Sequence, residues 1–205
     1  MSSDDSDLKV AGQSALIIGT LIAVGAGAYA LARKFKLLPV AKGLSGPRKI
    51  VALGDSLTAD GRYVRYLGAT GFGYVGRGVK DIASHLDEAL ALKPTDVIVF
   101  GGVNDLASGR SFSTITGELS KMYERIRAAG ARPVAVLVAP WKGDVAKTAA
   151  VNQWIRESGV AHVETWRLGS AEGRLLPSYN AGDGVHLNGA GQKALGKMIK
   201  EQAFA

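Results

Sequence analysis

Short runs of β-branched and aliphatic residues alternate with longer amphipathic stretches over most of this 205-residue chain. Each run has the length of a strand, and each longer stretch has the apolar spacing that is typical of a helix. Strands are expected at 49–53, 96–100, 134–138 and 160–165. Helices are expected at 79–91, 113–129, 144–158 and 189–202. This alternation predicts an α/β fold in which helices cover both faces of a parallel sheet.

Residues 10–32 depart from this pattern, because these 23 consecutive positions carry no charged side chain. A helix of that length spans a hydrocarbon core of about 30 Å. The chain opens with the acidic stretch MSSDDSD instead of the basic region of a signal peptide, so we expect a single-pass membrane anchor. The sequence AYALA at 28–32 resembles a cleavage site and leaves removal of this segment open.

Basic residues flank this apolar segment unequally. Lys9 is the only basic side chain before it, whereas six follow within residues 33–49. Because positive flanks tend to remain in the cytoplasm, the sequence predicts an external N-terminus and a cytoplasmic main domain. A domain that faces the cell envelope, or one associated with a viral membrane, is the alternative location.

The chain therefore divides into four parts. These are an acidic tail at 1–9, a transmembrane helix at 10–32, a basic linker at 33–48 and one compact domain at 49–205. The bilayer is the expected partner of residues 10–32. A face of small residues on this helix favours weak self-association, since small side chains let membrane helices approach closely. Its members are Ala15, Gly19, Ala23 and Gly27.

Composition excludes several classes of site. The chain has no cysteine, which rules out disulfides, cysteine-bound metals and thiol nucleophiles, and its three histidines disfavour a histidine-rich metal site. The formal net charge is +7, but no basic run is interleaved with aromatic residues. We therefore expect no nucleic-acid partner.

The first unusual motif, Gly-Asp-Ser-Leu-Thr at 54–58, directly follows the first expected strand. A serine on a tight turn between a strand and a helix exposes its hydroxyl at the sheet edge, where reactive groups of parallel sheets gather. Ser56 is therefore a candidate nucleophile. The alternative is that Ser56 only caps the helix that follows.

Two further motifs follow later strands. Asn104, in GGVND at 101–105, could direct its side-chain amide at a developing oxyanion, or could only form an Asx turn. Asp183 and His186 lie three residues apart just before the last helix. This spacing lets the carboxylate accept the Nδ1 proton of the imidazole, which leaves Nε2 free to act as a base.

In this order, Ser56, Asn104 and the Asp183–His186 pair resemble the motifs of the GDSL or SGNH hydrolase superfamily, and the resemblance covers residues 50–203. It implies a three-layer α/β/α, flavodoxin-like fold and the hydrolysis of carboxylic esters or thioesters without metal or cofactor. By the same resemblance, Ser56 is the nucleophile, His186 the general base and Asp183 the acid that orients it. The oxyanion hole would consist of the Ser56 N–H, the Asn104 side chain and a glycine N–H.

The position of that glycine is less regular than in the family pattern. Gly76 fits the spacing better than Gly78, and no clear strand is recognisable between Ser56 and Gly76, so the first crossover is expected to be shortened. The same region contains a literal G-x-G-x-x-G at 71–76. Without a strand before it and an acidic residue at the end of a following strand, this motif does not predict a nucleotide site.

Other residues near these motifs have simpler interpretations. Trp141 follows a strand end and either lines the substrate pocket or serves packing. Asp55 and Asp105 are expected to hold turns, and His85 and His162 are expected to be structural.

The substrate would be a small ester or an acylated component of the envelope. A non-catalytic structural or binding module of an envelope or virion, and an acyltransferase with the same triad, remain as alternatives.

Overall fold

The computed structural model describes residues 47–205. The expected tail, transmembrane helix and most of the linker lie outside the described residues. Within the part of the chain that is described, no helix is both long enough and apolar enough to cross a bilayer.

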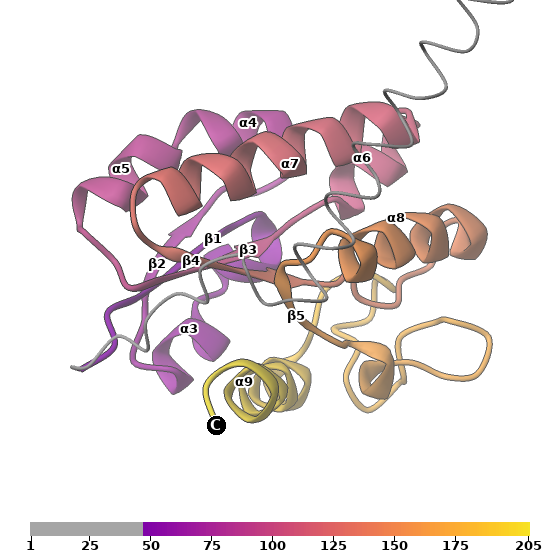
Figure 1. The fold of residues 1–205 in the computed structure, drawn as a ribbon. Coiled ribbons are helices and arrows are strands. Elements are labelled where there is room, and N and C mark those ends of the chain that lie inside the picture. The colour runs from indigo at the N-terminus through magenta and orange to yellow at the C-terminus, as the bar shows by residue number, and fades with distance from the viewer. Residues whose placement is uncertain (1–46) are drawn as a thin grey trace, which may run out of the picture. The chain divides into compact units, whose positions relative to one another are not determined.

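A parallel sheet of five strands forms the centre of the domain (Figure 1), in the order β2-β1-β3-β4-β5. The strands are β1 (Ile50–Gly54), β2 (Thr70–Gly73), β3 (Asp96–Phe100), β4 (Arg132–Val136) and β5 (Ala161–Val163). All neighbouring strands run parallel. The α/β class and the parallel sheet expected from the sequence are confirmed.

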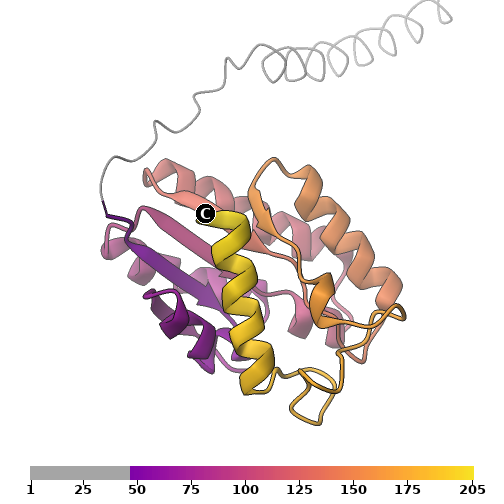
Figure 2. The ribbon, with the colours of Figure 1, turned by 90° about the horizontal axis from the view of Figure 1, so that it is seen from below.

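Helices cover both faces of this sheet (Figure 1). One face carries α4 (Val79–Ser84), α5 (Leu86–Ala91), α6 (Val103–Ala107), α7 (Phe112–Ala128) and α8 (Val145–Glu157). The other carries α3 (Arg62–Tyr66) and α9 (Gly189–Ala203), which lie side by side in Figure 2. The short helices α2 (Ser56–Ala59) and η1 (Trp166–Leu168) complete the described elements.

The two helical layers bury two separate clusters of apolar side chains, one on each face of the sheet. Successive residues of β3 show why: Val97 and Val99 belong to the cluster under α7, whereas Ile98 and Phe100 belong to the cluster over α9. This alternation follows from the two-residue period of a strand. Because helices cover both faces of the sheet, this strand is apolar at every position after Asp96, whereas a strand with one face in water would alternate apolar and polar residues.

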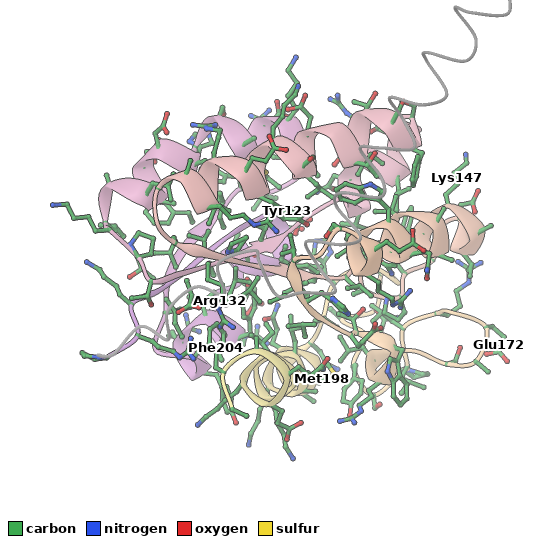
Figure 3. The ribbon with its side chains drawn as sticks, in the orientation of Figure 1. Tyr123, Arg132, Lys147, Glu172, Met198 and Phe204 are labelled. Carbon is green, nitrogen blue, oxygen red and sulfur yellow. The ribbon has the colours of Figure 1, made fainter. Side chains whose placement is uncertain are left out.

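The C-terminal end of α9 is held against the strand ends far from the reactive motifs. Arg132 and Phe204 pack together there (Figure 3), with the guanidinium carbon 5.3 Å from the ring centroid. Arg132 also pairs with the fully buried Asp96. These contacts anchor α9, whose other end leads directly from the loop that contains His186.

The edge strand β2 was not expected from the sequence. Its residues, TGFG, include two glycines and lack the β-branched run that marks a strand. Gly73 is nevertheless required, because a Cβ atom there would collide with the backbone of Ala59 in α2. The crossover from β1 to β2 therefore includes α3 and a paired strand, and the expectation that no strand separates Ser56 from Gly76 is wrong.

The strand β2 also explains the G-x-G-x-x-G sequence. Gly71 and Gly73 lie within β2, paired with Ala52 and Gly54 of β1, and not in a turn that follows a strand. A phosphate-binding turn needs these glycines between a strand and a helix. These glycines therefore serve the packing of β2 and do not form a phosphate-binding turn.

One expected helix is divided. Residues 79–91 form α4 and α5, separated at His85, whose φ of −98° and ψ of 5° leave the helical region. The His85 ring stacks on Tyr74 with centroids 3.8 Å apart. His85 therefore has a structural place at this break, as expected.

Candidate active site

Residues from distant parts of the chain meet at the carboxyl ends of the strands. The Nε2 atom of His186 lies 2.9 Å from the hydroxyl oxygen of Ser56. The Nδ1 atom of the same ring lies 2.5 Å from a carboxylate oxygen of Asp183. The structure thus brings the serine, the imidazole and the carboxylate into one continuous chain of hydrogen bonds.

The local sequence explains how Ser56 reaches this position. A Cβ atom on Gly54 would collide with the Phe100 carbonyl, so the turn after β1 requires glycine. Asp55 caps α2 by accepting a hydrogen bond from the Leu57 N–H at 2.9 Å. Ser56 is therefore the first residue of α2 and not its cap, which leaves its hydroxyl available.

His186 is held by the loop before α9. One Asp183 carboxylate oxygen accepts backbone hydrogen bonds from Val185 at 2.9 Å and His186 at 2.8 Å, and the other oxygen faces the imidazole. The pKa of Asp183 lies well below its usual range, mainly because its carboxylate is hydrogen-bonded to the His186 side chain. The two backbone hydrogen bonds lower this pKa further. Asp183 is therefore an ionised acceptor at neutral pH.

A neighbouring asparagine that sequence reasoning missed shapes the same loop. The Asn180 side-chain oxygen accepts hydrogen bonds from the Gly182 and Gly184 N–H groups at 2.9 and 3.0 Å. Both glycines have positive φ, 110° and 75°, a conformation that other residues rarely adopt. The only sequence signal for this role was the clustering of asparagine and glycine before the histidine.

Asn104 lies at the start of α6, and its side-chain NH2 donates to the carbonyl of Arg77 at 3.0 Å. The amide thus reaches across to the loop before α4 and does not cap its own turn. Of the two candidate glycines, Gly76 lies in an exposed turn with a φ of 72°, and a Cβ there would meet nothing within 4 Å. Gly78 is buried and shares a peptide group with the Arg77 carbonyl.

Asp105 fixes the position of Gly78. Its buried carboxylate accepts a hydrogen bond from the Val79 N–H at 2.8 Å and pairs with Arg110 at 3.4 Å. A Cβ on Gly78 would lie 2.6 Å from an Asp105 oxygen. Asp105 therefore joins α6 to the start of α4, which is a structural role, but one between two helices and not within a turn.

Asp55 is fully buried beside the serine. Among the described residues, one of its carboxylate oxygens has no hydrogen-bond partner. Burial raises the pKa of Asp55 to about 7, although the hydrogen bond from Leu57 opposes this shift. A carboxyl group next to the nucleophile is thus largely protonated below neutral pH.

Trp141 is buried at the carboxyl end of β4, and its indole N–H donates to the Thr148 hydroxyl at 2.8 Å. Its ring borders two spaces. One, shared with Asp55, Gly101 and Val185, is too small for a water molecule. The other is an apolar cavity of about 190 Å³ between α8 and η1.

Comparisons with known proteins identify the family and the fold. A family model described as the GDSL-like Lipase/Acylhydrolase family matches residues 52–194. Comparison with curated protein sequences gives no match.

Three solved structures illustrate the similarity of the fold. A protein described as a lipolytic member of the G-D-S-L family from Desulfitobacterium hafniense has a TM-score of 0.70 at 21% identity, over 76% of this chain and 99% of that one. A GDSL-like lipase from Bacteroides thetaiotaomicron has a TM-score of 0.66 at 20% identity, over 78% and 92%. An acetylxylan esterase from Geobacillus stearothermophilus has a TM-score of 0.63 at 19% identity, over 78% and 96%.

Proposed function

The chain belongs to the GDSL-like Lipase/Acylhydrolase family and is an ester hydrolase, and we propose that Ser56, His186 and Asp183 carry its reaction. The observation that supports this assignment most strongly is the pair of hydrogen bonds that His186 makes, one to the Ser56 hydroxyl and one to Asp183. An ionised Asp183 can only accept, so the Nδ1 proton faces it and Nε2 is free to accept a proton.

The reaction takes place in two steps. His186 Nε2 accepts the hydroxyl proton of Ser56 while the serine oxygen attacks the ester carbonyl carbon. The imidazolium then gives this proton to the leaving alcohol oxygen as the carbon–oxygen bond breaks, which leaves the acyl group on Ser56. A water molecule then attacks the acyl carbon while His186 Nε2 accepts its proton, and the imidazolium returns this proton to the Ser56 oxygen as the acyl–serine bond breaks and the acid leaves. Asp183 stabilises the imidazolium in both steps.

The negative charge on the carbonyl oxygen needs donors, and we assign the Ser56 N–H and the Asn104 side chain to this role. Gly76 and Gly78 are the candidates for a third N–H. The burial of Gly78 and its contact with Asp105, next to Asn104, favour Gly78. This assignment revises the preference for Gly76 that spacing alone suggested.

Steady-state hydrolysis of nitrophenyl acetate by the full-length protein tests the proposed triad. Ser56→Ala and His186→Ala are each expected to lower kcat by several orders of magnitude, and Asp183→Asn somewhat less. Ser84→Ala, at the end of α4, is the matched control and should keep the parental rate. Parental activity in Ser56→Ala would contradict the assignment. Release of the free acid distinguishes a hydrolase from an acyltransferase, which would form a new ester with an added alcohol.

We also propose that residues 10–32 anchor the enzyme in a membrane, where it would meet acylated lipids. The supporting observations are the 23 uncharged residues and the basic residues that follow them. The protein is then expected to stay in the membrane fraction after alkaline carbonate washing, and a C-terminal alkaline phosphatase fusion should be inactive. Release into the soluble fraction would contradict the anchor, and an active fusion would contradict the cytoplasmic orientation.

A further inference from the structure

A cavity of about 390 Å³ lies beside Ser56 and His186, at the start of α9. Most of its other side chains are polar, and Asn104 is not among its lining residues. Its remaining polar side chains are Asp60, Arg62, Asn188 and Gln192. The cavity thus lies on the histidine side of the nucleophile.

The proposed reaction identifies which part of an ester would occupy this space. The leaving oxygen must lie within hydrogen-bond reach of His186 Nε2, because that atom returns the proton to it. The alcohol portion of the ester therefore extends toward the side of Ser56 that His186 occupies. The cavity lies where the alcohol portion would extend, and this inference rests on the proposed function.

Two of the four polar side chains are already engaged in holding the fold. Gln192 donates to the Leu57 carbonyl at 3.0 Å and accepts from the Tyr63 N–H. Asn188 caps α9 and donates to the carbonyl of Ser178 at 2.9 Å. These side chains shape the cavity but have little capacity left for a ligand.

Asp60 and Arg62, unlike Asn188 and Gln192, keep hydrogen-bonding groups that could contact a ligand. The Arg62 Nε lies 3.2 Å from Asp60 Oδ1, and this carboxylate oxygen also accepts from the Arg62 N–H. In the part of the chain that the structure describes, the terminal amino groups of Arg62 and the second oxygen of Asp60 make no hydrogen bond. The pair therefore offers donors and an acceptor side by side at the cavity wall.

We propose that Asp60 and Arg62 bind the alcohol portion of the substrate and select esters of neutral, hydroxyl-rich alcohols. A hydroxyl group can donate to Asp60 and accept from Arg62 at the same time, and several hydroxyls on adjacent carbons match such a pair. A purely apolar alcohol would cover both charged groups without replacing their hydrogen bonds to water, which is costly.

An anionic alcohol fits this subsite less well. Its charge would lie close to the carboxylate of Asp60 in the cavity wall, and binding to Arg62 would have to compete with Asp60 for the guanidinium. Like charges at this separation oppose each other, whereas a neutral polyol meets no such repulsion. The local charges thus favour a neutral polyol over a phosphorylated one.

Three acetyl esters test the proposal on the full-length protein in detergent micelles. They are methyl 6-O-acetyl-glucoside as the neutral polyol ester, 1-acetyl-glycerol 3-phosphate as the anionic ester, and nitrophenyl acetate as a reference whose leaving group has no hydroxyls. The quantity measured is kcat/KM for each ester, divided by the value for nitrophenyl acetate. The variants are Arg62→Met and Asp60→Asn. Arg65→Met is the matched control, since Arg65 is exposed on the same helix and does not line the cavity.

The parent is expected to prefer the glucoside ester to the phosphate ester. Arg62→Met and Asp60→Asn should each lower the glucoside ratio at least tenfold, mainly through KM, and Arg65→Met should leave it unchanged. A glucoside ratio within twofold of the parent in both variants, or a preference for the phosphate ester, would overturn the proposal and leave the triad assignment standing. Failure of the parent to hydrolyse nitrophenyl acetate would overturn both.

Discussion

The buried carboxylate of Asp105 accepts a hydrogen bond from the Val79 N–H at 2.8 Å, across 26 positions of sequence. This bond connects α6, which contains Asn104, to the first residue of α4, which Gly78 directly precedes. Together with the hydrogen bond from Asn104 to the Arg77 carbonyl, it holds these two segments at a fixed distance. The proposed oxyanion donors depend on that distance, because donors must be placed before the charge develops.

Replacing Asp105 with alanine should therefore affect both stability and turnover. The Val79 N–H would lose its partner, which costs about 1–3 kcal/mol of unfolding free energy. We expect kcat for nitrophenyl acetate to fall at least tenfold, with a smaller change in KM. Asp105→Asn keeps an acceptor for Val79 and should lie between the alanine variant and the parent. Parental kcat in a folded Asp105→Ala protein would show that this connection does not position the donors.

Alanine at Gly76 and at Gly78 separates the two candidate oxyanion glycines. Gly76 has a φ of 72° in open space, so Gly76→Ala should lower stability by about 1–2 kcal/mol and leave kcat nearly unchanged. Gly78→Ala would push a methyl group against Asp105 and should lower kcat strongly. Asn104→Ala, the reference for a lost donor, is expected to lower kcat by about 10²–10³. The reverse order of the two glycine variants in kcat would restore Gly76 as the candidate.

Trp141 is expected to limit the acyl chain. The space between Asp55 and Trp141 is closed, and Trp141 also lines the apolar cavity of about 190 Å³. Trp141→Ala should join the two and shift the preference among nitrophenyl esters from acetate toward butyrate or hexanoate. Trp141→Phe keeps most of the bulk but loses the hydrogen bond to Thr148, and should retain the preference for acetate. If Trp141→Ala and the parent show the same preference among esters of different acyl length, Trp141 serves only packing.

The raised pKa of Asp55 predicts a contribution to the pH dependence of stability. The folded protein holds this proton up to about pH 7, whereas the unfolded chain loses it near the ordinary aspartate pKa of 3.8. The folded state binds more protons between these values, so this group makes stability fall as pH rises, by about 1.4 kcal/mol per pH unit. Asp55→Asn keeps an acceptor for the Leu57 N–H and should flatten the decline in urea midpoints between pH 5 and 7. If the urea midpoint of Asp55→Asn falls as steeply as that of the parent, the pH dependence of stability comes from other groups.

The sequence predicts the strands β1 and β3 well, because their apolar runs reflect burial on both faces of a parallel sheet. The edge strand β2 escapes prediction, since Gly73 is required by the close approach of α2 and Gly71 lies against Val64 of α3, whereas neither glycine favours a strand. Spacing alone favours Gly76, because it contains no information on the close approach of Gly78 to Asp105, a residue 27 positions further along the chain.

The same limit applies to the alcohol subsite. Asp60 and Arg62 read as ordinary surface charges at the start of a short helix, and only the fold brings α9 against them to form a cavity with His186. The Ser56, Asn104 and Asp183–His186 motifs are recognisable because each combines an unusual residue with a strand end or a loop of fixed spacing.

Covalent labelling tests the central claim, that Ser56 is the nucleophile, most directly. A fluorophosphonate reacts irreversibly with a serine that a neighbouring base activates. We expect one label per full-length molecule, located on Ser56 by peptide mass spectrometry, with hydrolysis of nitrophenyl acetate lost in proportion to labelling. Ser56→Ala should take up no label, and His186→Ala should take it up far more slowly. Labelling of a different residue, or full hydrolytic activity in protein labelled at Ser56, would contradict the account.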